Sequence, residues 1–253
     1  MTSDSWRGKV AIVTGGSSGI GAATALALVE RGACVAITGR NQARLKRVAA
    51  NSDAILALEL DSAQPSSAAS VVGAALGKWG RLDLLVNNAG AGKPLPIDAY
   101  TDEAITEIGA VNIVGPSLLV KHASGALRET RGAIVSVSSA VSRSAAPMLA
   151  HYAASKAALE HLTTSWAMEL AESGVRVNGV APGPVKSGAL TGMMGLKQDD
   201  ARMIEEREAL QVPLGRRGIT SDIVPWILRL GDSSNAWLTG QTITVDGGWS
   251  LRS

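Results

Sequence analysis

The chain contains 253 residues, of which 46% are hydrophobic and 18% charged, and this globular composition excludes the disordered and fibrous classes. It carries 24 Lys and Arg against 22 Asp and Glu, so the net charge of +2 argues against a nucleic-acid partner. Cys34 is the sole cysteine, the N-terminus has no apolar signal core, and no uninterrupted apolar run approaches the ~20 residues of a membrane span. We therefore expect a soluble cytoplasmic protein that makes no membrane contact.

Short apolar runs alternate with longer amphipathic stretches from one end of the chain to the other. Most runs are rich in Val and Ile and lack the alternation of a half-exposed strand, which is typical of strands buried on both faces. We predict strands at residues 10–14, 34–38, 55–60, 82–86, 133–137, 175–180 and 242–245. We predict helices near residues 20–31, 41–50, 66–79, 101–127, 152–173 and 220–231.

Repeated strand–helix–strand units imply right-handed crossovers and a parallel sheet. The predicted fold class is therefore α/β, a single-domain and doubly wound Rossmann fold over residues 1–253. Its seven-stranded parallel sheet should carry helices on both faces and bind ligands beyond the carboxyl ends of the strands.

Residues 183–213 interrupt the alternation of strands and helices. They contain three further glycines, the pair Met193 and Met194, and a charged helical stretch. Because a long insertion beyond a strand end is a typical position for a mobile lid, we predict a substrate lid near residues 187–212. The charged residues at 199–200 and 205–208 are interpreted as solvated helix faces.

The first predicted strand leads directly into residues 14–21, Thr-Gly-Gly-Ser-Ser-Gly-Ile-Gly, which open a helix. Glycines at positions 15, 19 and 21 allow the backbone to approach a ligand closely. The helix N-terminus offers free N–H groups and the positive end of a dipole, which together predict a pyrophosphate site. The spacing differs from the usual G-x-G-x-x-G pattern, and a tight turn that binds nothing is the alternative.

The end of the second predicted strand bears on the choice of cofactor. In NAD-binding versions of this fold an acidic residue there binds the adenosine ribose, but residues 38–41 are Thr-Gly-Arg-Asn. The planar guanidinium of Arg40 could pair with a 2′-phosphate, which favours NADP(H) over NAD(H). The alternative is that Arg40 is a solvated residue at a helix start.

Tyr152 and Lys156 are four residues apart in a predicted helix and so share one helix face. A free tyrosine has a pKa of about 10 and is a poor base at neutral pH. A lysine cation one turn away favours the phenolate, as does the charge of an oxidised nicotinamide. Tyr152 is therefore a candidate proton donor to a forming alkoxide, although such a pair taken alone is more often surface packing.

Further motifs accompany this pair in a fixed order along the chain. They are Asn-Asn-Ala-Gly at 87–90, Val-Asn at 111–112, Ser-Ser at 138–139, Tyr-Ala-Ala-Ser-Lys at 152–156, Arg-Val-Asn at 176–178, Pro-Gly at 182–183, Thr-Gly-Gln at 239–241 and Val-Asp-Gly-Gly at 245–248. Together with residues 14–21 they make the whole chain resemble a short-chain dehydrogenase/reductase. The resemblance is to the NADP(H)-preferring branch with chains of about this length, which includes 3-oxoacyl-carrier reductases.

The resemblance implies catalytic parts for Asn112, Ser139, Tyr152 and Lys156. Ser139 would bind the substrate oxygen, while its neighbour Ser138 would point into the sheet. Asn112 would hold a water that relays protons through Lys156, or would instead satisfy a local helix irregularity. The implied cofactor-binding residues are Gly15, Ser17, Ser18, Gly19, Ile20, Gly21, Arg40, Asp61, Asn88, Ala89, Gly90, Tyr152, Lys156, Pro182, Gly183, Val185 and Ser187.

The combined features predict an oxidoreductase that transfers hydride between NADP(H) and a ketone or secondary alcohol. The alternatives are a catalytically silent NADP(H)-binding sensor and an NAD-linked alcohol dehydrogenase. The histidines show no metal-ligand spacing, so no metal site is predicted. The resemblance also implies a homotetramer, or a homodimer.

The predicted pocket favours a lipophilic or cyclic small-molecule substrate over a sugar. Its apolar residues are Pro94, Leu95, Met148, Leu149, Leu190, Met193 and Met194. Met168 stands where enzymes that serve acyl carrier proteins often have Arg, which weakens the comparison with that subclass.

Overall fold

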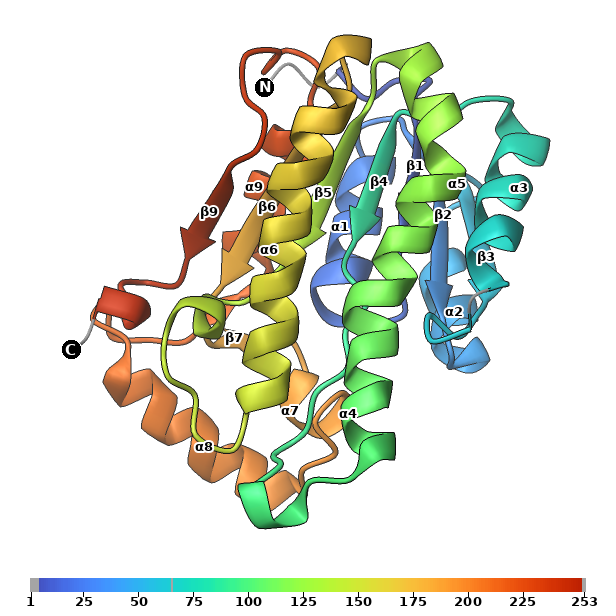
Figure 1. Ribbon diagram of the computed structural model, residues 1–253. Helices are drawn as coiled ribbons and strands as arrows, with labels where there is room; N and C mark the ends of the chain where they lie inside the picture. Colours follow the sequence, from blue (N-terminus) through green and yellow to red (C-terminus); the bar gives the residue numbers. More distant parts are fainter. Residues whose placement is uncertain (1–4, 65, 252–253) are drawn as a thin grey trace.

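The computed structural model describes residues 5–64 and 66–251. Seven strands form one parallel sheet in the order β3-β2-β1-β4-β5-β6-β9 (Figure 1). They are β1 Val10–Val13, β2 Cys34–Gly39, β3 Ile55–Glu59, β4 Leu84–Asn87, β5 Ala133–Val137, β6 Arg176–Pro182 and β9 Thr242–Val245. Each strand coincides with a predicted apolar run to within two residues, so the predicted seven-stranded parallel sheet is confirmed.

Helices cover both faces of the sheet, as predicted. On the face turned away from the viewer in Figure 1 lie α1 Gly19–Val29 and α9 Thr220–Gly231, and α2 Gln42–Ala49 packs into the same core. On the near face lie α3 Ser67–Trp79, α5 Gly115–Thr130 and α6 Ala150–Leu170.

Strand side chains divide between two hydrophobic cores, one on each face of the sheet. In β1, Ala11 and Val13 join the core beneath α1 and α9, whereas Val10 and Ile12 join the core beneath α3 and α5. All four are at most 3% exposed. Burying a Val or Ile side chain to this degree stabilises the fold by about 1.5–3 kcal/mol, which explains why these strands lack a polar face.

The strand order reverses between β1 and β4, at the middle of the sheet. From β1 the chain builds outward through β2 and β3, and from β4 it builds outward on the other side through β5, β6 and β9. Loops that leave the carboxyl ends of β1 and β4 therefore diverge and open a crevice, which is where ligands bind in this architecture.

The long helix predicted at residues 101–127 is interrupted. α4 Asp102–Gly109 is followed by one π-helical turn, Ala110–Val114, before α5 begins at Gly115. A Cβ atom on Gly115 would lie 2.5 Å from the carbonyl oxygen of Ser62, so only glycine lets the helix approach the loop after β3 here. Asn112 lies within the π-helical turn, at the kind of irregularity that often marks a functional site.

Taken as one unit, Asp102–Thr130 is long and apolar enough to cross a membrane, with a mean hydropathy of 1.3 over its most apolar window. The sequence has no unbroken apolar run of that length. Charged and polar residues are nevertheless sparse enough in this segment for its mean hydropathy to reach that of a membrane span. Of this window, 44% is buried inside the protein. The core helix of a soluble α/β protein meets the same test, so this is weak evidence for a membrane span.

The segment predicted as a lid forms two helices, α7 Ala189–Gly192 and α8 Gln198–Gln211. Two short strands that the sequence did not indicate, β7 Val185–Lys186 and β8 Gly218–Ile219, pair in parallel and close the base of this segment. Each is two residues long, which is too short to produce a readable hydrophobic pattern.

Candidate active site

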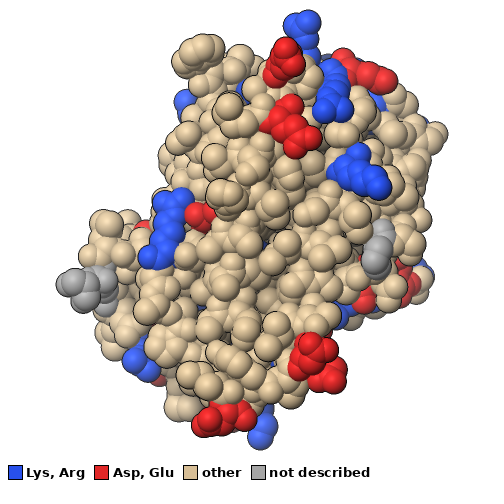
Figure 2. Space-filling model, viewed as in Figure 1, with Lys and Arg blue, Asp and Glu red and all other residues tan. Residues whose placement is uncertain are grey.

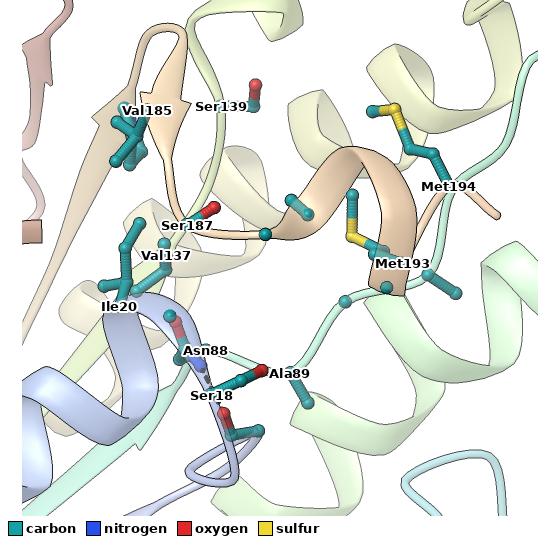
Figure 3. A pocket seen from close by; sticks show the side chains of 18 of the residues that line it. Ser18, Ile20, Asn88, Ala89, Val137, Ser139, Val185, Ser187, Met193 and Met194 are labelled. Carbon is teal, nitrogen blue, oxygen red and sulfur yellow. Dashed lines mark hydrogen bonds between the residues drawn. The ribbon is translucent and has the colours of Figure 1, made fainter. Parts of the chain in front are cut away.

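A cavity of about 660 Å³ opens at the carboxyl ends of the sheet strands. The glycine turn after β1 and the loop after β4 form its floor, and the segment around α7 crosses it on the opposite side (Figure 3). Of the residues predicted as catalytic or cofactor-binding, all but Gly21 and Asn112 line it. The predicted residues that do are Gly15, Ser17, Ser18, Gly19, Ile20, Arg40, Asp61, Asn88, Ala89, Gly90, Ser139, Tyr152, Lys156, Pro182, Gly183, Val185 and Ser187.

Different structural constraints require glycine at positions 15, 19 and 21 of the turn. Gly15 and Gly19 adopt the left-handed φ values of 65° and 56° that side chains other than glycine rarely tolerate. A Cβ atom on Gly21, in the first turn of α1, would lie 2.5 Å from the Asn88 amide nitrogen and would also clash with the Gly15 carbonyl. Gly21 therefore acts from behind the cavity, by letting α1 start directly against the turn.

Thr14 joins the ends of β1 and β4. Its buried hydroxyl accepts hydrogen bonds from the backbone N–H groups of Asn88 and Ala89, both at 2.9 Å, and donates to the Val86 carbonyl at 3.3 Å. The Asn88 side-chain amide donates to the carbonyl oxygens of Thr14 and Gly15. Asn88 thus lines the cavity while its amide holds the glycine turn (Figure 3).

Asn112 is fully buried in the π-helical turn. Its side-chain oxygen accepts the N–H of Ala91, and its amide nitrogen donates to the Ala91 carbonyl and to the Ser155 hydroxyl, each at 2.8 Å. The side chain therefore fixes the loop after β4 against α6, one residue before Lys156. These three bonds go to other segments and not to the backbone of the π-helical turn, so they do not support the interpretation that Asn112 satisfies a helix irregularity.

α6 carries Tyr152 and Lys156 on the face that closes the cavity, and both side chains are buried. The Lys156 ammonium donates to the Val137 carbonyl at 2.9 Å and lies 5.9 Å from the centroid of the Tyr152 ring. Gly92 permits this packing, because a Cβ atom there would lie 2.6 Å from the tyrosine ring. Sequence reasoning did not single out Gly92.

Burial sets the proton affinity of both groups. It raises the pKa of Tyr152 above its usual value, an effect that the hydrogen bond with Ser139 partly opposes. Burial also lowers the pKa of Lys156 to about 8. At neutral pH the phenol is therefore protonated and the lysine is mostly charged, a pair poised to give a proton to a nearby oxygen.

Glu160, one turn beyond Lys156, holds the strand end that carries Ser139. Its carboxylate accepts hydrogen bonds from the hydroxyls of Ser138 at 2.7 Å and Ser142 at 2.6 Å, and pairs with Arg143 at 3.0 Å. Ser138 therefore bonds to α6, where its hydroxyl also reaches the Lys156 carbonyl, and the expectation that it points into the sheet was wrong. These bonds flank Ser139 and leave its own hydroxyl facing Tyr152.

Comparison with known proteins matches this architecture over nearly the whole chain. The family model described as enoyl-(acyl carrier protein) reductase matches residues 15–250. An uncharacterised oxidoreductase of Methylorubrum extorquens is 36% identical over 247 residues, which cover 95% of this chain and 97% of that protein. A short-chain dehydrogenase/reductase of unknown function from Caenorhabditis elegans, solved with cofactor, has a TM-score of 0.92 at 32% identity, covering 98% and 97% of the two chains. The chain belongs to the short-chain dehydrogenase/reductase family.

A second solved short-chain dehydrogenase/reductase carries information on the cofactor. The 3-ketoacyl-(acyl-carrier-protein) reductase of Brucella melitensis, complexed with NADH, has a TM-score of 0.88 at 31% identity and covers 97% of this chain and 99% of its own. Membership of the family therefore makes this protein an oxidoreductase of short-chain dehydrogenase/reductase type, and it leaves the choice between the two nicotinamide dinucleotides to residues of the individual chain.

The cavity of this short-chain dehydrogenase/reductase also contains residues that sequence reasoning missed. Arg44, in the first turn of α2, also lines the cavity, and its Nη1 lies near Gly192 of α7. Glu208, Arg217 and Trp249 line it on the side of α8. Glu208 was interpreted as part of a solvated helix face, and this was wrong because its charged neighbours hide a residue that turns inward.

Only some of the apolar residues predicted for the substrate pocket line the cavity. Leu149, Leu190, Met193 and Met194 line the cavity, and Figure 3 shows both methionines above it. Pro94, Leu95 and Met148 do not line it. The Met148 carbonyl accepts the N–H of Leu95, and Met148 itself is 53% exposed with a left-handed φ of 64°.

Thr14→Val tests whether the threonine hydroxyl holds the site together. The change keeps the volume of the side chain but leaves the N–H groups of Asn88 and Ala89 without this acceptor. We expect the free energy of unfolding in urea to fall by about 2 kcal/mol. Thr164→Val is the control, because its exposed hydroxyl bonds only to a carbonyl of its own helix, and it should change stability by less than about 0.5 kcal/mol. Equal losses in the two variants would contradict a special role for Thr14.

Proposed function

We propose that this short-chain dehydrogenase/reductase is an NADP(H)-dependent carbonyl reductase acting on a ketone or the corresponding secondary alcohol. The observation that carries the proposal is the convergence of the Ser139 hydroxyl, the Tyr152 hydroxyl and the Lys156 ammonium on one wall of the cavity. Two hydroxyl donors beside a buried cation suit a reaction that develops negative charge on an oxygen atom.

The other wall fits a dinucleotide. Helix α1 begins after Ser18, whose side chain makes no capping hydrogen bond, so the first N–H groups of α1 face the cavity without a side-chain partner. A Cβ atom on Gly19 would lie 2.7 Å from the Ser187 carbonyl, so glycine keeps this cradle narrow. A pyrophosphate would be held there by the N–H groups and the helix dipole. When bound, the nicotinamide supplies or accepts the hydride.

NADP(H) is favoured over NAD(H) by the residues at the end of β2. Arg40 and Arg44 both line the cavity with exposed side chains, and residues 38–41 contain no carboxylate. Gly39 leaves room beside them, because a Cβ atom there would lie 3.0 Å from the Ser17 hydroxyl. Two guanidinium groups can hold a 2′-phosphate by charge-assisted hydrogen bonds, whereas residues 38–41 offer no carboxylate to accept the hydroxyls of an NAD ribose.

In the reductive direction, Tyr152 would give its proton to the oxygen of the ketone as charge forms there. The raised pKa of the phenol keeps that proton in place at neutral pH until the stronger base appears. Ser139 would donate a second hydrogen bond to the same oxygen. Lys156, charged below about pH 8, would stabilise the phenolate left behind.

Leu149, Leu190, Met193 and Met194 support a lipophilic or cyclic ketone as the substrate. Methionine side chains adapt to irregular apolar ligands, which suits such a cavity. A panel of hydrophobic ketones, polyols and a 2-enoyl thioester would test this, since the last is the substrate type named in the family model's description. Turnover restricted to polyols or to the enoyl thioester would contradict it.

Two other functions are less well supported. A silent NADP(H)-binding sensor has no evident use for a buried lysine cation beside Tyr152, since burial of a charged group costs stability. An NAD-linked alcohol dehydrogenase would leave Arg40 and Arg44 facing a ribose without a phosphate.

Tyr152→Phe should abolish ketone reduction. The ring keeps its packing against Gly92 but loses the proton donor, so kcat should fall by at least about 10²-fold while NADPH still binds. NADPH consumption measures the rate, and quenching of protein fluorescence measures binding. Tyr100→Phe is the matched control and should keep near-normal activity, because Tyr100 does not line the cavity. Full activity in Tyr152→Phe would overturn the proposal.

Arg40→Asp should reverse the cofactor preference. A carboxylate would repel the 2′-phosphate and accept the hydroxyls of the NAD ribose, so the ratio of kcat/KM for NADPH to that for NADH should fall by at least about tenfold. The control is Arg47→Asp, an equal change of charge on the exposed side of α2 outside the cavity. An unchanged ratio in Arg40→Asp would refute the assignment of NADP(H).

We further propose that the protein is cytoplasmic and assembles as a homotetramer, or a homodimer. Its one free cysteine suits a reducing compartment. Figure 2 shows that charged side chains gather toward the ends of the face formed by α5 and α6 and are sparse in its middle, and Met168 of α6 is 78% exposed. Sedimentation velocity at micromolar concentration should give a tetramer or dimer, and a monomer would contradict the proposal.

A further inference from the structure

Three charged side chains meet where the lid adjoins the cavity. Arg217, directly before β8, is only 4% exposed, and Glu205 and Glu208 lie about one turn apart on α8. Arg217 Nε lies 3.0 Å from Glu208 Oε2, and Arg217 Nη1 contacts Glu205 Oε1. A third nitrogen, Nη2, donates to the Val185 carbonyl at 3.0 Å.

This arrangement leaves an uncompensated negative charge. Each nitrogen of the guanidinium lies against a protein oxygen, although Nε and Nη1 lack hydrogen-bond geometry, so the charge of Arg217 is already paired within the protein. Two carboxylates face one cation, which gives the cluster a net charge of −1 when all three groups are ionised. Burial raises the pKa of Glu208, and repulsion from Glu205 raises it further. The attraction of Arg217 lowers this pKa by less than the other two effects raise it.

Only one of the two carboxylates is placed to meet a substrate. Glu208 lines the cavity with a side chain that is 23% exposed, whereas Glu205 is 39% exposed and does not line it. The other carboxylate in the lining, Asp61, follows β3 on the far side and already accepts the N–H of Ala63 at 3.0 Å.

Glu208 lies toward the reacting end of the cavity. Trp249, another lining residue of this side, belongs to a short 3-10 helix, Trp249–Leu251, which packs against the one that follows Ser139, Ala140–Arg143. Arg217 bonds to Val185, which also lines the cavity. A substrate whose carbonyl oxygen sits at Ser139 and Tyr152 would therefore extend between apolar walls toward this carboxylate.

We propose that Glu208 is a substrate-recognition residue that selects ketones bearing a hydrogen-bond-donating group, a protonated amine above all, and rejects anionic ones. The proposal rests on the carbonyl reductase function. It narrows the substrate from an apolar ketone to an amphipathic one with an apolar body and one polar, non-anionic end. It also disfavours substrates with a free carboxylate or phosphate at that end.

The test compares ketones that share one cyclic skeleton and differ only in a substituent: none, an ammonium, a hydroxyl or a carboxylate. For the unaltered protein with NADPH, kcat/KM should be highest for the amine and at least about tenfold lower for the acid. In Glu208→Gln this discrimination should shrink to about twofold, since an amide no longer attracts a cation.

Glu205→Gln is the matched control. It also removes one of the two carboxylate charges that pair with Arg217, but Glu205 lies outside the cavity. It should lower thermal stability about as much as Glu208→Gln does and leave the order of substrates unchanged. Glu208→Asp keeps the charge and should preserve a preference for the amine. Equal discrimination in the two glutamine variants, or a preference of the unaltered protein for the acid, would overturn the proposal.

The unsubstituted ketone separates this proposal from the function on which it rests. If it is not reduced, the carbonyl reductase function fails. The role of Glu208 is then decided by calorimetric binding of the three substituted compounds to the NADPH-loaded protein. The amine is expected to bind most tightly and the acid most weakly. Equal affinities, or tighter binding of the acid, would overturn the role of Glu208.

Discussion

The hydrogen bonds that join the ends of β1 and β4 are the constraint on which the rest of the site depends. Strand order reverses between these two strands, so their loops diverge and would splay without a tie. Thr14 and Asn88 supply that tie with a buried hydroxyl and a half-buried amide. Gly21 lets α1 start directly against it. The crevice, the open N-terminus of α1 and the cavity follow from this junction.

α6 adds the chemistry by burying a tyrosine and a lysine that would be ordinary on a surface. Burial strengthens the hold of Tyr152 on its proton and weakens that of Lys156, so the pKa values of the two groups move apart. The backbone carbonyl of Val137 compensates the buried ammonium, and the carboxylate of Glu160 fixes the serines around Ser139. One helix thus carries the tyrosine that we propose as proton donor and the carboxylate that fixes the serines beside Ser139.

The segment that contains α7 and α8 forms part of the cavity wall and not of the central sheet. Its methionines give the cavity an adaptable apolar wall, while α8 is held to β7 through the buried guanidinium of Arg217. An excess carboxylate at the same place costs desolvation energy that the arginine does not fully offset. A carboxylate carried at such a cost, beside apolar residues of the cavity wall, is suited to distinguish one ligand from another.

The sequence by itself determined the sheet, the helices, the glycine turn and the Tyr152–Lys156 pair, because hydrophobic periodicity and local spacing encode them. Only the tertiary structure decided which polar residues work as framework, since the amides of Asn88 and Asn112 bond to backbone that is distant or irregular. It also decided that Glu208 turns inward and that the long helix breaks at Ala110–Val114. Glu208 meets Arg217 across the turn that follows α8, and Gly115, directly after the break, packs against Ser62 in a distant loop. No hydrophobic pattern records either contact.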